Sequence, residues 1–336
     1  MSELNKIALK ILSNGKGILA ADESNGTMTK RLESVNVPSS PENRLIFRET
    51  LFSASGMKDF IGGVILYDET INQKSNSKHT IPELISMSGA VPGIKVDTGT
   101  KILAGSHEEK ITEGLDGLRE RLKEYYKLGA RFTKWRGVYN ISDKYPSKLS
   151  MHSNAHALAR YSALVQECGM VPIIEPEVLM DGNHSAETCF NKTSEVIKKC
   201  FEELIIHKID LSGIILKPNM ILAGTTSNKK ISNEEVAKLT LKCLKENVPT
   251  DVPGIAFLSG GQAEVEAAEN LNLINKYNDT NFIMTYSYGR ALQQSALKFW
   301  SNDINNTNGT QKVFNHRANM CTLAAQGKWS KELETK

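Results

Sequence analysis

Eight apolar, strand-like runs alternate with segments of helical periodicity, and this alternation constrains the fold more than any other feature. In chain order the runs are GKGILAAD, IGGVILYDET, VPGIKVDTG, RFTKWRGV, MVPIIEPEV, GIILKPN, PGIAFLSGG and FIMTYSYGR. Between them, residues 111–129 and 232–247 carry apolar side chains on one helical face, and the second segment opens with a serine cap and two acids. Alternating strands and helices predict a parallel sheet, and eight repeats favour a closed (β/α)8 TIM barrel.

The competing open, doubly wound sheet fits the sequence poorly. No GxGxxG motif follows the first strand-like run, and no acidic residue closes a second one as a dinucleotide site requires. No linker rich in Pro, Gly or Ser divides the chain, so we expect one barrel domain over residues 1–336. Residues 1–12 read as an amphipathic helix start rather than a signal peptide, and residues 301–311, SNDINNTNGTQ, read as a mobile loop.

Composition excludes several classes of protein. The 41 Lys and Arg residues nearly balance the 38 Asp and Glu residues, which argues against a nucleic-acid partner. No membrane span is evident. Five cysteines match neither CxxC spacing nor a disulfide framework, so reduced thiols in the cytoplasm are expected. His152 and His156 stand four apart, but no HExxH glutamate or third ligand accompanies them, so we interpret them as surface or capping residues and expect no metal.

Charged residues gather where the strand-like runs end. The set comprises Asp22, Lys95, Lys134, Arg136, Glu175, Glu177 and Lys217. Side chains two apart on a strand face the same way, and the catalytic groups of barrels sit at the carboxyl ends of the strands. A layer of structural salt bridges is the alternative, but it would require many desolvated charges to gather without a ligand. The set therefore predicts an active site.

Lys217 follows an apolar run directly and precedes a proline, so its ammonium group is expected to be buried. Burial and a neighbouring cation both lower the pKa of a lysine, which makes it a nucleophile. Lys134 is either the neighbouring cation or itself the nucleophile, and spacing does not decide between the two.

Two segments predict anion binding. The SGG and SYGR runs follow the seventh and eighth strands, where barrels commonly bind phosphate, and Arg290 begins the next helix. The loop DESNGTMTKR contains Ser24, Thr27 and Arg31 and is a weaker candidate, because composition alone predicts a helix cap followed by a solvated face.

The motifs GILAADES, IGGVIL, GIKVD, TKWR, VPIIEPE, ILKPNM, FLSGGQ and SYGRALQ, in this order, closely resemble class I fructose-1,6-bisphosphate aldolase from about Leu4 to Trp329. The resemblance implies a metal-independent lyase of glycolysis and gluconeogenesis, without a cofactor and usually homotetrameric. Such an enzyme cleaves its phosphorylated ketose substrate, fructose 1,6-bisphosphate, reversibly to dihydroxyacetone phosphate and glyceraldehyde 3-phosphate through a lysine Schiff base.

The resemblance also assigns roles to residues. Lys217 forms the imine, Glu175 is the acid and base, and the rest of the catalytic ring consists of Asp22, Lys134, Arg136 and Glu177. The ketose C1 phosphate is assigned to Ser259, Gly260, Gly261, Ser287, Gly289 and Arg290. The opposite phosphate is assigned to Ser24, Thr27, Arg31 and Lys95. Asp22 and Glu175 both remain candidates for the base at the C4 hydroxyl.

One departure from the family pattern affects proton transfer. Many members end in a tail whose terminal tyrosine assists protonation at C3, whereas the last tyrosine here is Tyr288 and the sequence ends QGKWSKELETK. We therefore expect residues 301–336 to form an extension without that tyrosine, and enamine protonation to limit turnover. Another Schiff-base enzyme, such as a transaldolase or a sedoheptulose 1,7-bisphosphate aldolase, is the alternative activity, although two phosphate sites argue against transaldolase. A scaffold that binds acidic protein segments is the non-catalytic alternative.

Overall fold

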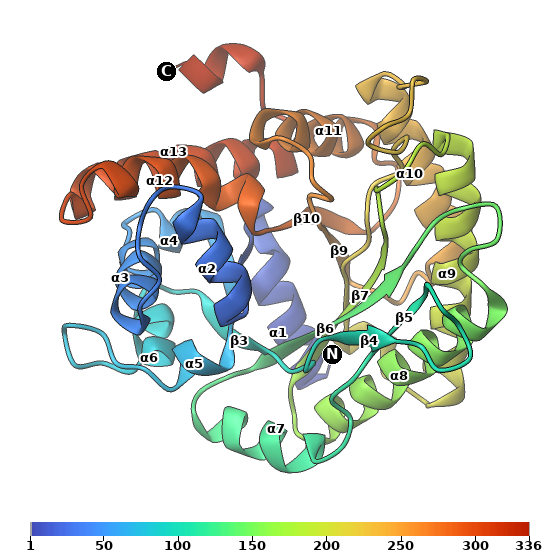
Figure 1. Ribbon diagram of the computed structural model, residues 1–336, viewed down its shortest axis with the longest axis horizontal. Coiled ribbons are helices and arrows are strands. Elements are labelled where there is room, and N and C mark those ends of the chain that lie inside the picture. Colours follow the sequence, from blue (N-terminus) through green and yellow to red (C-terminus); the bar gives the residue numbers. More distant parts are fainter. Residues whose placement is uncertain (1, 336) are drawn as a thin grey trace.

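Eight parallel strands pair edge to edge into a closed barrel, as the sequence predicts. The computed structural model describes residues 2–335 (Figure 1). Around the barrel the strands run β1, β10, β9, β8, β7, β6, β3 and β2, and back to β1. Their bounds are β1 (Gly17–Ala21), β2 (Ile61–Leu66), β3 (Val91–Lys95), β6 (Phe132–Tyr139), β7 (Val171–Val178), β8 (Ile215–Leu216), β9 (Gly254–Phe257) and β10 (Ile283–Tyr288).

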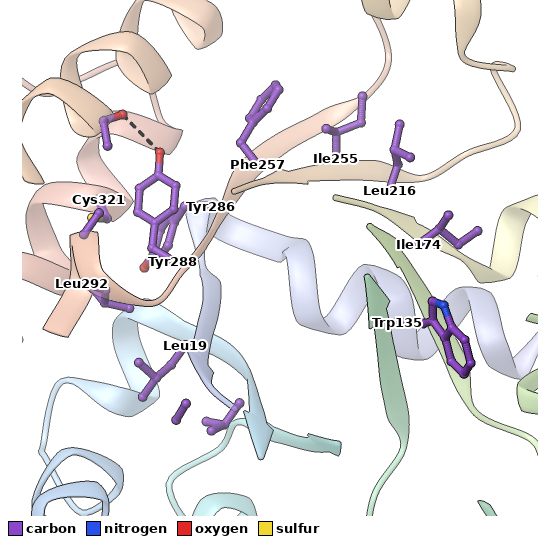
Figure 2. Close-up of a cluster of buried hydrophobic side chains, with 14 of the residues drawn as sticks. Leu19, Trp135, Ile174, Leu216, Ile255, Phe257, Tyr286, Tyr288, Leu292 and Cys321 are labelled. Atoms are coloured by element: carbon purple, nitrogen blue, oxygen red, sulfur yellow. Dashed lines mark hydrogen bonds between the residues drawn. The ribbon is translucent and has the colours of Figure 1, made fainter. Parts of the chain in front are cut away.

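Successive side chains of each strand point alternately into the barrel and out toward the helices. On β7, Ile173 belongs to the interior apolar cluster, whereas Ile174 belongs to the outer one. Figure 2 shows the outward set, in which Ile174 on β7, Leu216 on β8 and Phe257 on β9 lie in one apolar layer. The next inward position after Ile173 is Glu175, so the alternation of side chains along the strand points this carboxylate into the barrel.

The amino-terminal helix α1 (Glu3–Leu12) closes the end of the barrel at which the strands begin. Ser2 caps it by accepting a hydrogen bond from the Asn5 backbone N–H. Ile11 and Leu12 join the interior apolar cluster of the barrel. A Cβ atom on Gly62 of β2 would lie 1.8 Å from the carbonyl oxygen of Ile11, so only glycine permits this approach of helix and strand. The amphipathic helix predicted at this end is confirmed.

Helices cover the outside of the barrel between successive strands (Figure 1). They are α2 (Asn25–Glu33), α3 (Pro41–Phe52), α4 (Met57–Phe60), α5 (Asp68–Ile71), α6 (Ile81–Met87), α7 (Leu118–Lys127), α8 (Lys148–Glu167), α9 (Ala186–Ile206), α10 (Asn233–Asn247), α11 (Glu264–Tyr277), α12 (Arg290–Asn302) and α13 (Thr307–Ala325), with 3-10 turns η1 (Ser13–Gly15), η2 (Leu211–Gly213) and η3 (Lys331–Thr335). Within residues 2–335, no helix combines the length and apolarity needed to cross a bilayer.

Two helix predictions have different outcomes. The predicted helix at 232–247 is confirmed, including its cap, because the Ser232 side chain accepts a hydrogen bond from the Glu235 backbone N–H. The predicted helix at 111–129 begins only at Leu118. Its first residues instead form β5 (Lys110–Thr112), which pairs antiparallel with β4 (Thr100–Ile102) in a hairpin that the sequence did not predict.

The prediction of a mobile loop at residues 301–311 is wrong. Helix α12 continues to Asn302 and helix α13 begins at Thr307, so only a short turn joins them. The side chain of Asn306 caps α13 by accepting a hydrogen bond from the Gly309 backbone N–H. A Cβ atom on Gly309 would lie 2.5 Å from the Phe299 ring, so this glycine allows the two helices to pack closely. The Asn-rich and Gly-containing composition marks a cap and a tight contact rather than a loop.

The outer layer is densely packed around aromatic side chains. Tyr286 and Tyr288 on β10 lie beside Leu292 and Cys321 (Figure 2) and donate hydrogen bonds to the carbonyl oxygens of Phe60, at 2.8 Å, and Ala267, at 3.1 Å. The five cysteines, at 168, 189, 200, 243 and 321, are free thiols, as their spacing predicts.

Candidate active site

A cavity of about 720 Å³ opens at the carboxyl ends of the barrel strands, where the sequence places its charged residues. Every residue assigned to the site from the sequence lines this one cavity. The predicted catalytic residues among them are Asp22, Lys134, Arg136, Glu175, Glu177 and Lys217. The predicted substrate-binding residues are Ser24, Thr27, Arg31, Lys95, Ser259, Gly260, Gly261, Ser287, Gly289 and Arg290.

Four side chains, three of them buried, form a continuous chain of alternating charge in the cavity. Lys217 Nζ lies 3.0 Å from Glu175 Oε1, and the other oxygen of that carboxylate lies 3.2 Å from Lys134 Nζ. Lys134 Nζ also lies 2.8 Å from Asp22 Oδ2. Lys217, Lys134 and Glu175 are each about 95% buried, since their exposed fractions are 4%, 5% and 4%. Among residues 2–335, Lys134 therefore bridges two carboxylates, whereas Lys217 contacts one.

The two carboxylates and Lys134 hold one another in their charged forms. Burial raises the pKa of Asp22, but the nearby ammonium groups of Lys134 and Lys217 outweigh it and lower that pKa to about 2. Burial likewise opposes ionisation of Glu175, whose pKa nevertheless falls below its ordinary value because of the same two lysines. Burial lowers the pKa of Lys134, but Asp22 and Glu175 together raise it well above the usual range. Lys134 is therefore a permanent cation in this site.

The second carboxylate on β7, that of Glu177, has a pKa shifted in the opposite direction from that of Glu175. Burial raises the pKa of Glu177 above its ordinary value, even though Arg136 Nε lies 2.5 Å from its Oε2 atom. The pairs predicted to point together, Lys134 with Arg136 and Glu175 with Glu177, do both face the cavity. The site thus contains one carboxylate, Glu175, that is held charged and another, Glu177, that is more easily protonated.

The loops after β9 and β10 present polar groups at one end of the cavity. Gly260 and Gly261 have φ angles of 56° and 82°, a left-handed conformation that turns the backbone toward the cavity and favours glycine. Helix α12 begins at Arg290 without a side-chain cap on its free N–H groups. The buried hydroxyl of Ser287 has no hydrogen-bond partner within residues 2–335. These features are together suited to bind an anion.

The loop after β1 forms the opposite end of the cavity. Ser24 caps α2, as predicted, by accepting a hydrogen bond from the Thr27 backbone N–H. The prediction of a solvated face after this cap is wrong for Arg31, which is only 9% exposed because its guanidinium pairs with Glu23. Two guanidinium nitrogens of Arg31 remain buried without a hydrogen-bond partner in the described chain, and they are available to an anion.

Two acidic residues in the cavity were not assigned from the sequence. Glu23 pairs with Arg31 and lies 3.5 Å from a guanidinium nitrogen of Arg48. Asp97 lies 3.4 Å from Lys95 Nζ. Glu23 pairs with arginines on two later helices, which no local pattern indicates, whereas Asp97 pairs with Lys95 two positions before it.

The acidic side chains of this cavity do not converge on a common point as metal ligands do. In the described part of the chain, the group of His, Cys and acidic side chains that could hold a metal consists of His156, Glu203 and His207, none of which lines it. The cavity instead combines buried lysines and carboxylates with polar and basic groups at both ends that are suited to bind anions. This combination suits covalent amine chemistry on a doubly phosphorylated carbonyl compound.

Comparison with known proteins decides the family. The sequence profile described as "Fructose-bisphosphate aldolase class-I" matches residues 3–336. The chain belongs to the class I fructose-bisphosphate aldolases. Members of this lyase family cleave fructose 1,6-bisphosphate in glycolysis. The resemblance and the barrel fold predicted from the sequence are both confirmed.

Relatives from bacteria, plants and animals cover nearly the whole aldolase chain. A "Probable fructose-bisphosphate aldolase class 1" of Xylella fastidiosa is 46% identical over 98% of this chain and 99% of its own. "Fructose-bisphosphate aldolase 4, cytosolic" of Arabidopsis thaliana is 47% identical over 97% of this chain and 83% of its own. The solved aldolase of Plasmodium falciparum, in complex with TRAP and a small molecule inhibitor, superposes with a TM-score of 0.96 at 44% identity, covering 98% of this chain and 95% of its own.

Proposed function

We propose that this aldolase cleaves fructose 1,6-bisphosphate reversibly through a Schiff base on Lys217. The observation that carries the proposal is the position of this lysine, which is buried in the cavity, 3.0 Å from Glu175, with anion sites on both sides. Breaking the C3–C4 bond of a ketose leaves an electron pair at C3. A protonated imine at C2 accepts that pair far better than the ketone does.

The pairing of the two lysines supports Lys217 rather than Lys134 as the nucleophile. Lys134 lies between Asp22 and Glu175, which raise its pKa and keep it charged. A charged ammonium group has no lone pair for attack on a carbonyl. In the described part of the chain, Lys217 contacts a single carboxylate oxygen, on Glu175, and that oxygen can accept its proton. In this proposal Lys134 is the cation that organises the site.

Glu175 acts as the main proton carrier. The amine of Lys217 adds to the C2 carbonyl to form a carbinolamine, and Glu175 protonates the hydroxyl that leaves as water when the imine forms. Cleavage then needs a base that removes the proton of the C4 hydroxyl, and either Asp22 or Glu175 is in the cavity to do so. The enamine left on Lys217 gains a proton at C3, and hydrolysis releases dihydroxyacetone phosphate and restores the free lysine.

The two anion sites hold the substrate in register. The end formed by Ser259, Gly261, Ser287 and Arg290 would bind the C1 phosphate, and the end formed by Ser24 and its neighbours would bind the other phosphate. Fixing both ends places C2 beside Lys217 and converts binding free energy into orientation. We further infer that one barrel domain carries the whole reaction and that no metal participates, because the carboxylates of the cavity pair with lysines and arginines.

A cytoplasmic homotetramer is part of the same proposal. Five free thiols fit a reducing compartment, and a plant relative is named cytosolic. The tetramer rests on the family resemblance and is tested by sedimentation velocity, in which a monomer would contradict it.

A coupled assay tests the substrate directly. Release of dihydroxyacetone phosphate, the product that all three ketoses share, is followed through a dehydrogenase that reduces it, with fructose 1-phosphate and sedoheptulose 1,7-bisphosphate as comparison substrates. We expect the highest kcat/KM with fructose 1,6-bisphosphate. Preference for the seven-carbon ketose would assign the protein a different substrate, and cleavage of none of the three would contradict the proposed reaction.

A further inference from the structure

A cluster of three histidines and one buried glutamate lies outside the barrel, between helices α8 and α9. The two helices pack against each other on the same side of the molecule (Figure 1). Each contributes two side chains four residues apart, His152 and His156 from α8, and Glu203 and His207 from α9. Residues four apart lie on one helical face, so the two pairs meet across the helix contact.

The side chains converge on the carboxylate of Glu203. His156 Nδ1 lies 3.2 Å from one carboxylate oxygen, and His152 Nδ1 lies 3.2 Å from the other. One ligand atom from each of His156, Glu203 and His207 lies within 4.8 Å of the other two. Tetrahedral zinc ligands at about 2.1 Å from the ion lie about 3.4 Å apart. Modest side-chain rotations are therefore enough to bring these three atoms onto one ion.

The orientation of His207 favours a ligand role. Its Nδ1 atom lies 2.8 Å from the backbone carbonyl oxygen of Glu203, and a carbonyl can only accept a hydrogen bond. Nδ1 therefore carries the proton, which leaves the lone pair on Nε2. Metal-binding histidines commonly have this arrangement, because the hydrogen bond on one nitrogen fixes the tautomer and turns the other toward the ion.

A purely structural role for the cluster explains less of the geometry. Lys199 Nζ lies 3.1 Å from one oxygen of Glu203 and partly neutralises this carboxylate, whose side chain is only 5% exposed. A single lysine would be sufficient for that purpose. Three imidazoles would not be needed, and those of His152 and His156 are 61% and 45% exposed, which leaves an open path for an ion from solvent.

We propose that His156, Glu203 and His207 bind one divalent transition-metal ion of the zinc type, with His152 or water in the remaining position. Two imidazole nitrogens and one carboxylate oxygen suit zinc and its neighbours rather than magnesium or calcium, which prefer all-oxygen sites. None of these residues lines the active-site cavity, so the ion would join α8 to α9 and take no part in catalysis.

Metal titration of the untagged full chain tests the site. The protein is stripped with EDTA, dialysed into chelator-free buffer and titrated with zinc by calorimetry, and then with cobalt, whose visible absorption reports tetrahedral coordination. We expect one ion per chain and a higher unfolding temperature in the presence of zinc. His156→Asn and Glu203→Gln should each weaken zinc binding at least about tenfold. His107→Asn is the matched control, because His107 is exposed and lies in the β4–β5 hairpin, and it should bind zinc like the parent.

Several outcomes would overturn the proposal. Absence of stoichiometric zinc binding would do so directly. Equal zinc affinity of the parent and His156→Asn would also do so, provided that circular dichroism shows both folded. His156→Asn is the deciding variant, because its histidine is half exposed and caps no helix, whereas loss of His207 would also disturb the end of α9. Aldol cleavage should be the same with and without zinc, so a failed metal site would leave the proposed reaction untouched.

Discussion

Replacing Lys134 with methionine should lower the free energy of unfolding by about 3–5 kcal/mol near neutral pH, the usual cost of breaking a buried ion pair. The shifted pKa of Asp22 indicates an interaction of similar size. Burial raises the pKa of Asp22, yet its lysine neighbours lower it from 3.8 to about 2, a difference worth about 2–3 kcal/mol. The Asp22 side chain is only 12% exposed, so solvent screens this interaction little. Lys134 is also the largest cause that lowers the pKa of Glu175, so its removal affects two carboxylates.

The pH dependence of the lost stability shows whether the loss comes from unneutralised carboxylates or from poor packing of the methionine. In the parent, the depressed pKa of Asp22 gives a stabilisation that is complete above pH 3.8 and disappears as the pH falls through about 2. In the variant, Asp22 and Glu175 face each other with Lys217 as their remaining close lysine, and burial should then hold their folded-state pKa values above the unfolded ones. Their folded form then binds more protons, so the variant should lose stability as the pH rises.

Urea denaturation at a fixed protein concentration measures both effects. The loss relative to the parent should be greater at about pH 8 than at about pH 5. Lys127→Met is the matched control, because this lysine is 70% exposed and pairs only with Glu124, and the substitution should leave stability nearly unchanged. A loss below about 1 kcal/mol that does not vary with pH would refute the claim that Lys134 neutralises the carboxylate pair.

Three further predictions concern catalysis. Arg290→Ala should raise KM for fructose 1,6-bisphosphate about 10- to 100-fold with little change in kcat, because it removes a charged phosphate contact worth about 1.5–3 kcal/mol; an unchanged KM would place the phosphate elsewhere. Glu175→Gln should lower kcat by a factor of about 10² to 10⁴, because the amide keeps the shape of the side chain but cannot carry protons; a kcat close to that of the parent would remove Glu175 from the mechanism. EDTA should leave aldol cleavage intact whether or not zinc occupies the α8–α9 cluster, and strong inhibition would indicate a metal-dependent reaction.

The sequence predicts the barrel and its charged mouth for a specific physical reason. Parallel strands are buried on both faces, so each appears as a continuous apolar run, and a charged residue at its end is conspicuous. Lys217 after GIIL and Glu175 after VPII are the clearest cases. The hairpin formed by β4 and β5 lacks this signal, because each of its strands is only three residues long and largely exposed.

Contacts between distant segments could not be predicted from the sequence. Arg31 follows a helix cap and appears solvated, but its partner Glu23 and the packing around α2 bury it. His156 and Glu203 are separated by 47 residues, and only the packing of α8 on α9 brings them together. Local periodicity reports which face of an element is buried. It does not report which neighbour that face will meet.

The most direct test of the proposed mechanism is chemical trapping of the Schiff base. Borohydride added in the presence of dihydroxyacetone phosphate reduces an imine to a stable amine, and peptide mass mapping then locates the label. The proposed mechanism predicts a single adduct on Lys217, the buried lysine 3.0 Å from Glu175, together with loss of cleavage activity in proportion to labelling. A label on Lys134 instead, or full activity after borohydride treatment with no adduct on any lysine, would contradict it.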